Sequence, residues 1–298
     1  MKLEKSKIIL ISGPTASGKS KFAVKIANKI KGEIINADSM QVYKDLNILT
    51  AKPSKNDLKN IKHHFYGIID LNKNFSTGQW LSLVSKKIKK IRKKKKVPIL
   101  VGGTGLYFQS LIDGLVKIPK VPEKLRKKIR VMQKTLGQKK FYSKLLKIDK
   151  KVQNKFDPKD TQRSIRAYEI KLYTKVSIYE WIKKTKPLFS ENEFLKLYID
   201  FDREELVKRI SNRTTKMLKD GAIKEVLKFN KKKIKEDSSV NKVIGINELQ
   251  KYLNSELSLN QAKELIAIRT RQYAKRQRTW ARTRMFSWNK IAPNEISK

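Results

Sequence analysis

Residues 8 to 27 have the sequence IILISGPTASGKSKFAVKIA, and the middle of this stretch constrains the fold of the chain more than any other feature. It matches the pattern G-x-x-x-x-G-K-[S/T], whose glycines and lysine form a loop that binds phosphate oxygens. An apolar run from Ile8 precedes the loop, and apolar residues at helical spacing follow it. Strand, loop and helix therefore occur in the order that a phosphate-binding loop requires. The loop consists of Gly13, Pro14, Thr15, Ala16, Ser17, Gly18, Lys19 and Ser20.

The residue types in this loop suit a diphosphate group. Backbone N–H groups at the start of a helix bind anionic oxygens, and Lys19 adds a positive charge. The Ser20 hydroxyl can bind Mg²⁺, and the Thr15 and Ser17 hydroxyls can add contacts to the diphosphate. We therefore expect Mg²⁺ as a cofactor at Ser20.

Strands and helices alternate around this loop. We expect strands over residues 7–12, 33–36, 97–101 and 195–200, and helices over residues 19–30 and 81–96. Alternation of this kind predicts an α/β fold with a parallel sheet and flanking helices, as in P-loop NTPases.

The sequence pattern changes after Ile118, where prolines interrupt the chain. Residues 123–146 and 157–173 are charged and helical in pattern, and Asp157-Pro158 is a suitable start for the second helix. We therefore predict a helical insertion over residues 119–192. The catalytic core is then formed by residues 1–118 and 193–298.

The net charge of +44 comes from 71 lysines and arginines against 27 acidic residues. Such a charge attracts polyanions, and a nucleic acid is the first partner to consider. Because only 14 of the 71 are arginine, a general bias toward lysine explains the total equally well. A basic stripe on the last helix, at Arg271, Lys275, Arg278 and Arg282, either follows an RNA backbone or is a solvated helix face. On charge alone, a non-enzymatic RNA-binding protein is also possible.

Several other classes are excluded or disfavoured. The chain has no cysteine, which excludes disulfides, thiolate zinc sites and a cysteine nucleophile. No apolar run approaches the roughly 18 residues of a membrane span, so we expect a cytoplasmic protein with no membrane partner. His63 and His64 have no acidic residue at metal-ligand spacing, so we expect no metal site there.

A second acidic motif would be expected if the loop bound ATP for hydrolysis. The most apolar strand, residues 97–101, ends in glycines where such a protein usually has an aspartate. Asp200 and Asp202 are the only substitutes, and each could instead be a surface or helix-capping carboxylate. Asp38 follows another strand at the edge where α/β proteins bind ligands, and it could accept a proton or stabilise a turn. The loop could thus serve an ATP-dependent kinase of a small molecule or nucleic acid, or it could hold another diphosphate.

Six motifs in order along the chain resemble those of the bacterial tRNA dimethylallyltransferases. They are Gly13-Pro14-Thr15-Ala16-Ser17-Gly18-Lys19-Ser20, Asp38-Ser39-Met40-Gln41-Val42-Tyr43, Thr50-Ala51-Lys52-Pro53, Gly102-Gly103-Thr104-Gly105-Leu106-Tyr107, Asp160-Thr161-Gln162-Arg163-Ser164-Ile165-Arg166-Ala167-Tyr168-Glu169, and Thr270-Arg271-Gln272-Tyr273-Ala274-Lys275-Arg276-Gln277 followed by Thr279-Trp280. They extend from residue 8 to about residue 282, and the departures are small, such as Ile246 where the family usually has tyrosine.

The resemblance implies transfer of a dimethylallyl group from dimethylallyl diphosphate to N6 of the adenosine on the 3′ side of the anticodon, position 37. The exocyclic amine of adenine is a weak nucleophile, so a base must remove its proton, and Asp38 is the candidate. Departure of diphosphate requires fixed positive charge, for which Lys19, Arg209 and Arg213 are candidates, with Thr15 beside them.

The resemblance also implies that tRNA is the partner, bound through its anticodon stem-loop by the insertion. The target base must leave its stack to react. The expected tRNA-binding residues are Asp38, Ser39, Met40, Gln41, Thr104, Arg126, Gln162, Arg163, Ser164, Ile165 and Arg166. We expect the enzyme to act as a monomer.

Overall fold

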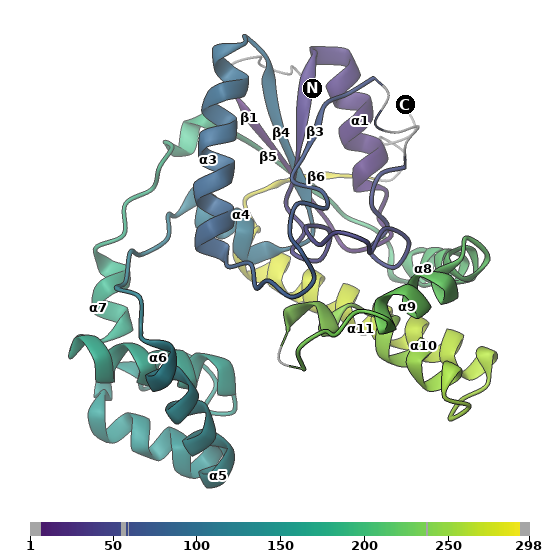
Figure 1. Ribbon diagram of the computed structural model, residues 1–298. Helices are drawn as coiled ribbons and strands as arrows, with labels where there is room; N and C mark the ends of the chain where they lie inside the picture. The colour runs from purple at the N-terminus through teal and green to yellow at the C-terminus, as the bar shows by residue number, and fades with distance from the viewer. Residues whose placement is uncertain (1–6, 55–57, 59, 237, 293–298) are drawn as a thin grey trace. The chain divides into compact units, whose positions relative to one another are not determined.

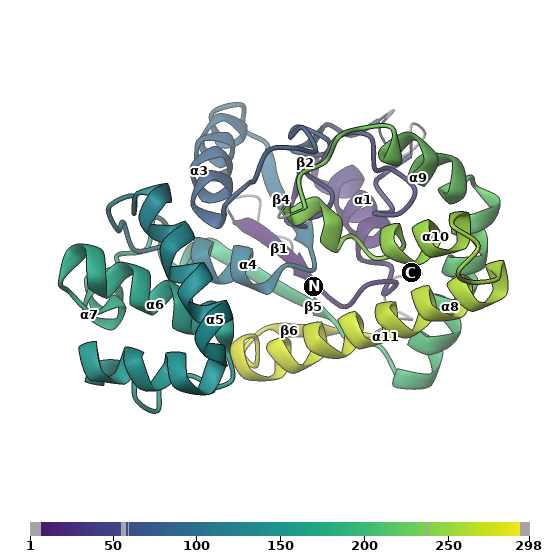
Figure 2. The ribbon, with the colours of Figure 1, turned by 60° about the horizontal axis from the view of Figure 1, so that its bottom comes forward.

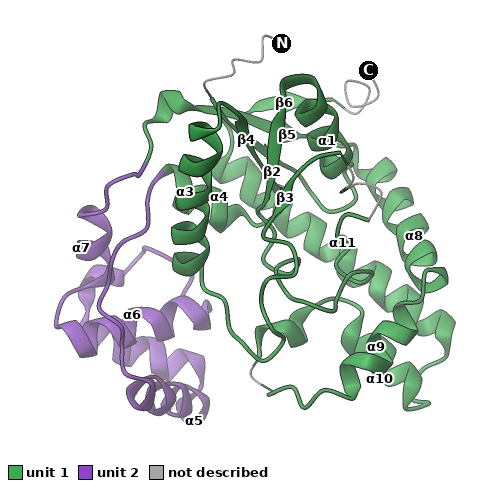
Figure 3. Cartoon of the chain, turned by 45° about the horizontal axis from the view of Figure 1, so that its top comes forward, with its two compact units in different colours: residues 1–112, 189–298 green, residues 113–188 purple. Residues whose placement is uncertain are grey.

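A computed structural model describes residues 7–54, 58, 60–236 and 238–292. The chain divides into two compact units, which are coloured separately in Figure 3. Unit 1 comprises residues 1–112 and 189–298, and unit 2 comprises residues 113–188. From the sequence, we predicted the insertion over residues 119–192. Pro119 interrupts the chain at the first boundary, and strand character resumes after the second. None of the helices in the described parts of the chain is long and apolar enough to cross a membrane.

Unit 1 is built on a six-stranded sheet in which every described strand pair is parallel (Figure 1). The strand order is β3-β2-β4-β1-β5-β6, so the strand before the phosphate loop lies at the centre. The strands are β1 (Ile8–Ser12), β2 (Gly32–Asn36), β3 (His63–His64), β4 (Val97–Gly102), β5 (Phe194–Ile199) and β6 (Asn289–Ile291). This confirms the predicted α/β fold.

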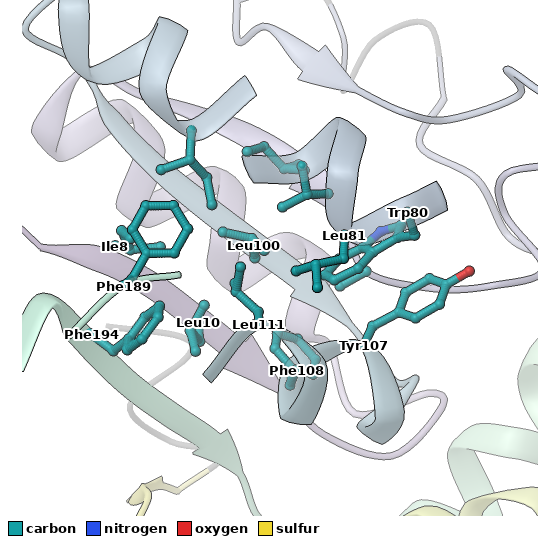
Figure 4. Close-up of a cluster of buried hydrophobic side chains, with 14 of the residues drawn as sticks. Ile8, Leu10, Trp80, Leu81, Leu100, Tyr107, Phe108, Leu111, Phe189 and Phe194 are labelled. Carbon is teal, nitrogen blue, oxygen red and sulfur yellow. The ribbon is translucent and has the colours of Figure 1, made fainter. Parts of the chain in front are cut away.

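Helices cover both faces of the sheet, because its central strands are apolar on both sides. One face packs against α3 (Thr77–Lys93) and α4 (Gly105–Ile112), and α1 (Lys19–Ile30) lies on the other (Figure 1). Every residue of β1, β2 and β4 is buried. In the α3 and α4 layer Trp80 stacks on Tyr107 with ring centroids 4.2 Å apart, at one end of the cluster drawn in Figure 4.

Unit 1 also contains four α-helices in the second half of its described residues. They are α8 (Arg203–Lys219), α9 (Ala222–Asn230), α10 (Ile246–Leu253) and α11 (Leu259–Arg284). Helix α11 packs against α8 and α10, as Figure 2 shows along its length. It reaches three separate clusters, with Ile266 packed among α9 and α10, Ala274 beside α1 and α8, and Ala281 beside α3 and α4. One helix thus connects these three apolar clusters.

Unit 2 contains α5 (Glu123–Ile148), α6 (Thr161–Thr174) and α7 (Ile178–Lys183). Helix α5 is interrupted at Gly137, which has a non-helical backbone. The predicted start of α6 at Asp157 is wrong. The Asp160 side chain caps the helix by accepting the Arg163 N–H, whereas Asp157 accepts the Lys159 N–H in a preceding turn.

Candidate active site

The phosphate loop joins the central strand β1 to the first turn of α1. Gly18 precedes the helix with φ of 86°, a left-handed conformation that suits glycine. The ammonium group of Lys19 folds back over the loop and donates to the Pro14 carbonyl oxygen at 3.1 Å. Ser17 is fully buried, while Ser20 is exposed at the helix start. The loop therefore presents a cation and a helix N-terminus at one edge of the sheet.

The side chain of Gln277 on α11 connects the phosphate loop to the loop that follows β4. Its side-chain oxygen accepts the Thr15 N–H at 2.8 Å, and its side-chain nitrogen donates to the Gly103 carbonyl oxygen at 3.0 Å. Thr15 lies after β1 and Gly103 lies after β4, so one amide bridges the carboxyl ends of two adjacent strands. The position of the phosphate loop is therefore set by α11 as well as by β1.

Two arginines of α8 also contact the phosphate loop, where the family resemblance led us to expect at least one of them. Arg209 donates through Nε to the Ala16 carbonyl oxygen at 2.8 Å, and its guanidinium lies 4.8 Å from the centre of the Phe201 ring. Arg213 donates through Nη1 to the Thr15 hydroxyl at 2.8 Å. Both predicted arginines therefore lie at the phosphate loop.

Asp38 lies in the turn that follows β2. Its N–H donates to Oδ1 of the buried Asn36 at 2.9 Å, and its own Oδ1 accepts the Met40 N–H at 2.9 Å. The next residue, Ser39, donates its N–H to the Thr104 hydroxyl at 3.0 Å. These bonds fix the Asp38 turn against the loop after β4, which also carries Gly103.

The electrostatics place Asp38 near the cations of the phosphate loop. Burial lowers the pKa of Lys19 to about 8, an effect that Asp38 opposes and Arg213 strengthens. Burial also lowers the pKa of Arg213, again opposed by Asp38. Burial and then the charge of Asp38 raise the pKa values of three tyrosines, which are Tyr66, Tyr107 and Tyr273. A carboxylate, two cations and three phenols therefore share one electrostatic environment.

The other residues expected to contact RNA in unit 1 support this turn. Gln41 donates its side-chain N–H groups to the carbonyl oxygens of Thr50 and Ala51 at 2.8 and 3.0 Å. Met40 is partly buried and packs against the apolar cluster of α9, α10 and the start of α11. Gln41 thus joins the Asp38 motif to the Thr50 motif.

In unit 2 the expected RNA-binding residues separate into two groups. Gln162, Arg163 and Arg166 are exposed on α6. Ser164 and Ile165, expected beside them, are buried, because α6 turns this side toward the core of the unit. Ser164 instead donates its hydroxyl to the Asp160 carbonyl oxygen at 2.8 Å, and its side chain is therefore not part of the exposed surface.

The remaining acidic and histidine candidates have structural partners. Asp202 caps α8 by accepting the N–H groups of Glu204 and Glu205, and Asp200 lies 3.8 Å from Lys290. Nε2 of His64 lies 2.7 Å from the buried Glu33 carboxylate. His63 donates through Nδ1 to the Ile61 carbonyl oxygen at 2.8 Å. Within the described ranges, no group of three or more histidine or acidic side chains is arranged to bind a metal ion.

Sequence reasoning missed two residues that shape the site. Gln277 belongs to a recognised motif, but its two partners lie far away in the sequence. Glu225 on α9 accepts the N–H groups of Asn47, Ile48 and Leu49 at 2.6 to 2.9 Å, and so holds the loop that carries the Thr50 motif. No local pattern marks Glu225, because its partners are backbone groups.

Together, the parallel sheet and the phosphate loop at its carboxyl edge define an α/β protein of the P-loop-like class. The sequence model of the IPP transferase family matches residues 41–284. The chain therefore belongs to the IPP transferase family.

Individual relatives agree with this assignment. A tRNA dimethylallyltransferase of Pelagibacter ubique is 69% identical over 293 residues, which cover 98% of this chain and 94% of that protein. One of Rickettsia felis is 40% identical over 279 residues, covering 93% and 90%. The chain is accordingly a tRNA prenyltransferase, as predicted.

Solved structures extend the similarity to the fold. The chain is similar to a eukaryotic dimethylallyltransferase that acts on tRNA, with a TM-score of 0.85, 30% identity, and coverage of 98% of this chain and 75% of that one. It is also similar to the full-length tRNA isopentenylpyrophosphate transferase of Bacillus halodurans, with a TM-score of 0.69, 30% identity, and coverage of 97% and 90%.

Proposed function

We propose that the chain transfers the dimethylallyl group of dimethylallyl diphosphate to N6 of adenosine 37 in tRNA, with Asp38 as the general base. A bond forms between N6 and C1 of the dimethylallyl group as the bond from C1 to the diphosphate oxygen breaks. Asp38 accepts the N6 proton, and diphosphate leaves. The observation that carries this proposal is the placement of the Asp38 carboxylate in the electrostatic environment of Lys19 and Arg213.

The phosphate loop supplies the charge that the leaving group needs. Negative charge grows on the diphosphate as the carbon–oxygen bond breaks, and fixed cations and N–H groups stabilise it more than they stabilise the substrate. Lys19 and Arg213 are both partly buried. Their charges act more strongly there than they would in bulk water. Arg209 contributes through its hold on the Ala16 carbonyl, which shapes the loop.

Mg²⁺ fits this site through the hydroxyl of Ser20, an exposed residue in the first turn of α1. Mg²⁺ prefers oxygen ligands and keeps several waters, so one protein hydroxyl together with the diphosphate oxygens is a suitable set. When bound, the ion would neutralise part of the leaving-group charge.

The RNA side of the reaction uses both units. Ser39 and Thr104, which are hydrogen-bonded to one another, lie next to Asp38 and are suited to contact the extruded base. On unit 2, the exposed residues Gln162, Arg163 and Arg166 are suited to bind the anticodon stem-loop through phosphates or by stacking.

The experiment uses the purified chain, unmodified tRNA and Mg²⁺, with either radiolabelled dimethylallyl diphosphate or γ-labelled ATP. Prenyl label should appear in the RNA at adenosine 37, and Asp38→Asn should abolish its transfer while diphosphate binding persists. Asp200→Asn is the matched control, because it removes a partly exposed carboxylate at the end of β5. Phosphate release from ATP without prenyl transfer would refute the proposal and indicate a kinase. Full activity of Asp38→Asn would refute the role of the base.

A further inference from the structure

Unit 2 contains a buried carboxylate surrounded by three arginines. Glu169 belongs to the core-facing side of α6, and its side chain is only 2% exposed. Its carboxylate oxygens lie 3.6 Å from Nε of Arg126, 3.9 Å from Nε of Arg130 and 3.3 Å from Nη1 of Arg166. Arg126 and Arg130 are one turn apart on α5, so two helices contribute to the cluster.

The charges of this cluster do not balance. Three guanidinium groups against one carboxylate leave a net charge of about +2, because arginine stays protonated at any ordinary pH. Among the residues that the structure describes, the ion pairs of these three arginines all run to Glu169. The arginine side chains are 43, 48 and 44% exposed, so each also faces solvent.

Stability alone gives a weak reason for this arrangement. A buried ion pair often contributes little, because removing charges from water offsets their attraction. One carboxylate oxygen of Glu169 and Nε of Arg126 are buried without a hydrogen bond. The distances of 3.6 and 3.9 Å leave both α5 arginines with N–H groups for another acceptor.

We propose that Glu169 is a positioning residue, which gathers Arg126, Arg130 and Arg166 into a binding site for a backbone phosphate of the substrate RNA. Three like charges repel each other, and the carboxylate below them offsets that repulsion before the RNA arrives. Guanidinium groups suit a phosphate because their parallel N–H donors match its oxygens. This inference rests on the proposed function, and it adds Arg130 to the RNA-binding surface.

The Glu169→Gln variant distinguishes a positioning role of Glu169 from a simple effect of its charge on RNA affinity. The substitution raises the net positive charge by one, so a purely electrostatic surface would bind RNA more tightly. If Glu169 positions the arginines, affinity for an unmodified anticodon stem-loop should instead fall about tenfold, the worth of about one phosphate contact. Glu123→Gln is the matched control, because it removes an exposed carboxylate of α5 that pairs with Lys127 of the same helix, away from Glu169 on α6. Its affinity should stay equal or rise.

A second variant keeps the test independent of folding. Arg130→Gln changes a half-exposed residue, and it should lower the slope of log affinity against log salt by about one, as the loss of one phosphate contact requires. With full-length tRNA, KM should rise in both variants while kcat at saturation is unchanged. Tighter binding by Glu169→Gln, or an unchanged salt slope in Arg130→Gln, would overturn the inference. Failure of the wild-type chain to bind the stem-loop would instead contradict the proposed function.

Discussion

Lys19 should make the affinity of the site for diphosphate depend on pH. Burial lowers the pKa of its ammonium group to about 8, so Lys19 loses its proton in a range where most lysines stay charged. A diphosphate binds the ammonium form, because a neutral amine supplies no positive charge. Affinity should therefore fall as the pH rises through about 8.

The size of the effect follows from the pKa. A group with a pKa of about 8 is roughly 0.8 protonated at about pH 7.5 and roughly 0.1 protonated at about pH 9. The dissociation constant should rise about eightfold over this interval, or about 1.2 kcal/mol of binding free energy. The nearby tyrosines stay neutral, because burial and Asp38 raise the pKa values of Tyr66, Tyr107 and Tyr273.

Titration calorimetry with a non-reactive thio analogue of dimethylallyl diphosphate would measure the dissociation constant across this interval. Binding at about pH 8 should also take up about half a proton, which buffers of different ionisation enthalpy reveal. Lys19→Arg is the control, because a guanidinium keeps its charge throughout. A flat wild-type profile, or the same slope in Lys19→Arg, would refute the reasoning.

Gln277→Leu removes two hydrogen bonds worth about 1 kcal/mol each; we expect a modest loss of thermal stability and a larger loss of diphosphate affinity, seen by calorimetry. Gly102→Ala would place a Cβ 2.1 Å from a backbone oxygen, which should lower the free energy of unfolding by about 3 kcal/mol in chemical denaturation. Acid should destabilise the fold through Glu33 and His64. Burial lowers the pKa of His64, so its protonation below its ordinary 6.5 costs stability. Burial opposes ionisation of Glu33, but hydrogen bonds to His64 and Lys96 lower the pKa of its carboxyl group. The stability that Glu33 contributes is therefore lost as the pH falls below about 4.5. The free energy of unfolding of Glu33→Gln should therefore change less than that of the wild type below about pH 4.5, as chemical denaturation at several pH values would show. Between there and about pH 6.5 it should change more, because the hydrogen bond to Glu33 raises the pKa of His64 against burial.

The elements that the sequence predicted best are those with a strong local pattern. The helix after the phosphate loop was predicted over residues 19–30 and is observed as α1 over Lys19–Ile30, because its apolar spacing and the glycine before it both mark it. The short edge strand β6 was not predicted, since Asn289–Ile291 becomes a strand only by pairing with β5. The start of α6 was misplaced because Asp157-Pro158 is a suitable helix start by sequence, whereas in the structure Asp157 stabilises a preceding turn and Asp160 caps the helix.

The candidate site shows the same division. The phosphate loop and Asp38 were found because each belongs to a motif, and the α8 arginines were found because the resembled family has arginines in that segment. Gln277 bonds to residues 262 and 174 positions away, and Glu225 bonds to backbone groups about 177 positions away. Such contacts depend on how α11 and α9 pack, which no local pattern encodes.

The net charge of +44 can be interpreted only when the roles of arginine and lysine are considered separately. Arg209 and Arg213 hold the phosphate loop, and Glu169 gathers arginines on unit 2. A planar guanidinium can bond the protein and an anion together, whereas a lysine ammonium is a hydrated point charge. The lysines at the end of α3, such as Lys93, are instead exposed and favour the helix dipole. Specific recognition of diphosphate and RNA should therefore depend on Lys19 and the few arginines, while the many exposed lysines contribute a general attraction that salt screens.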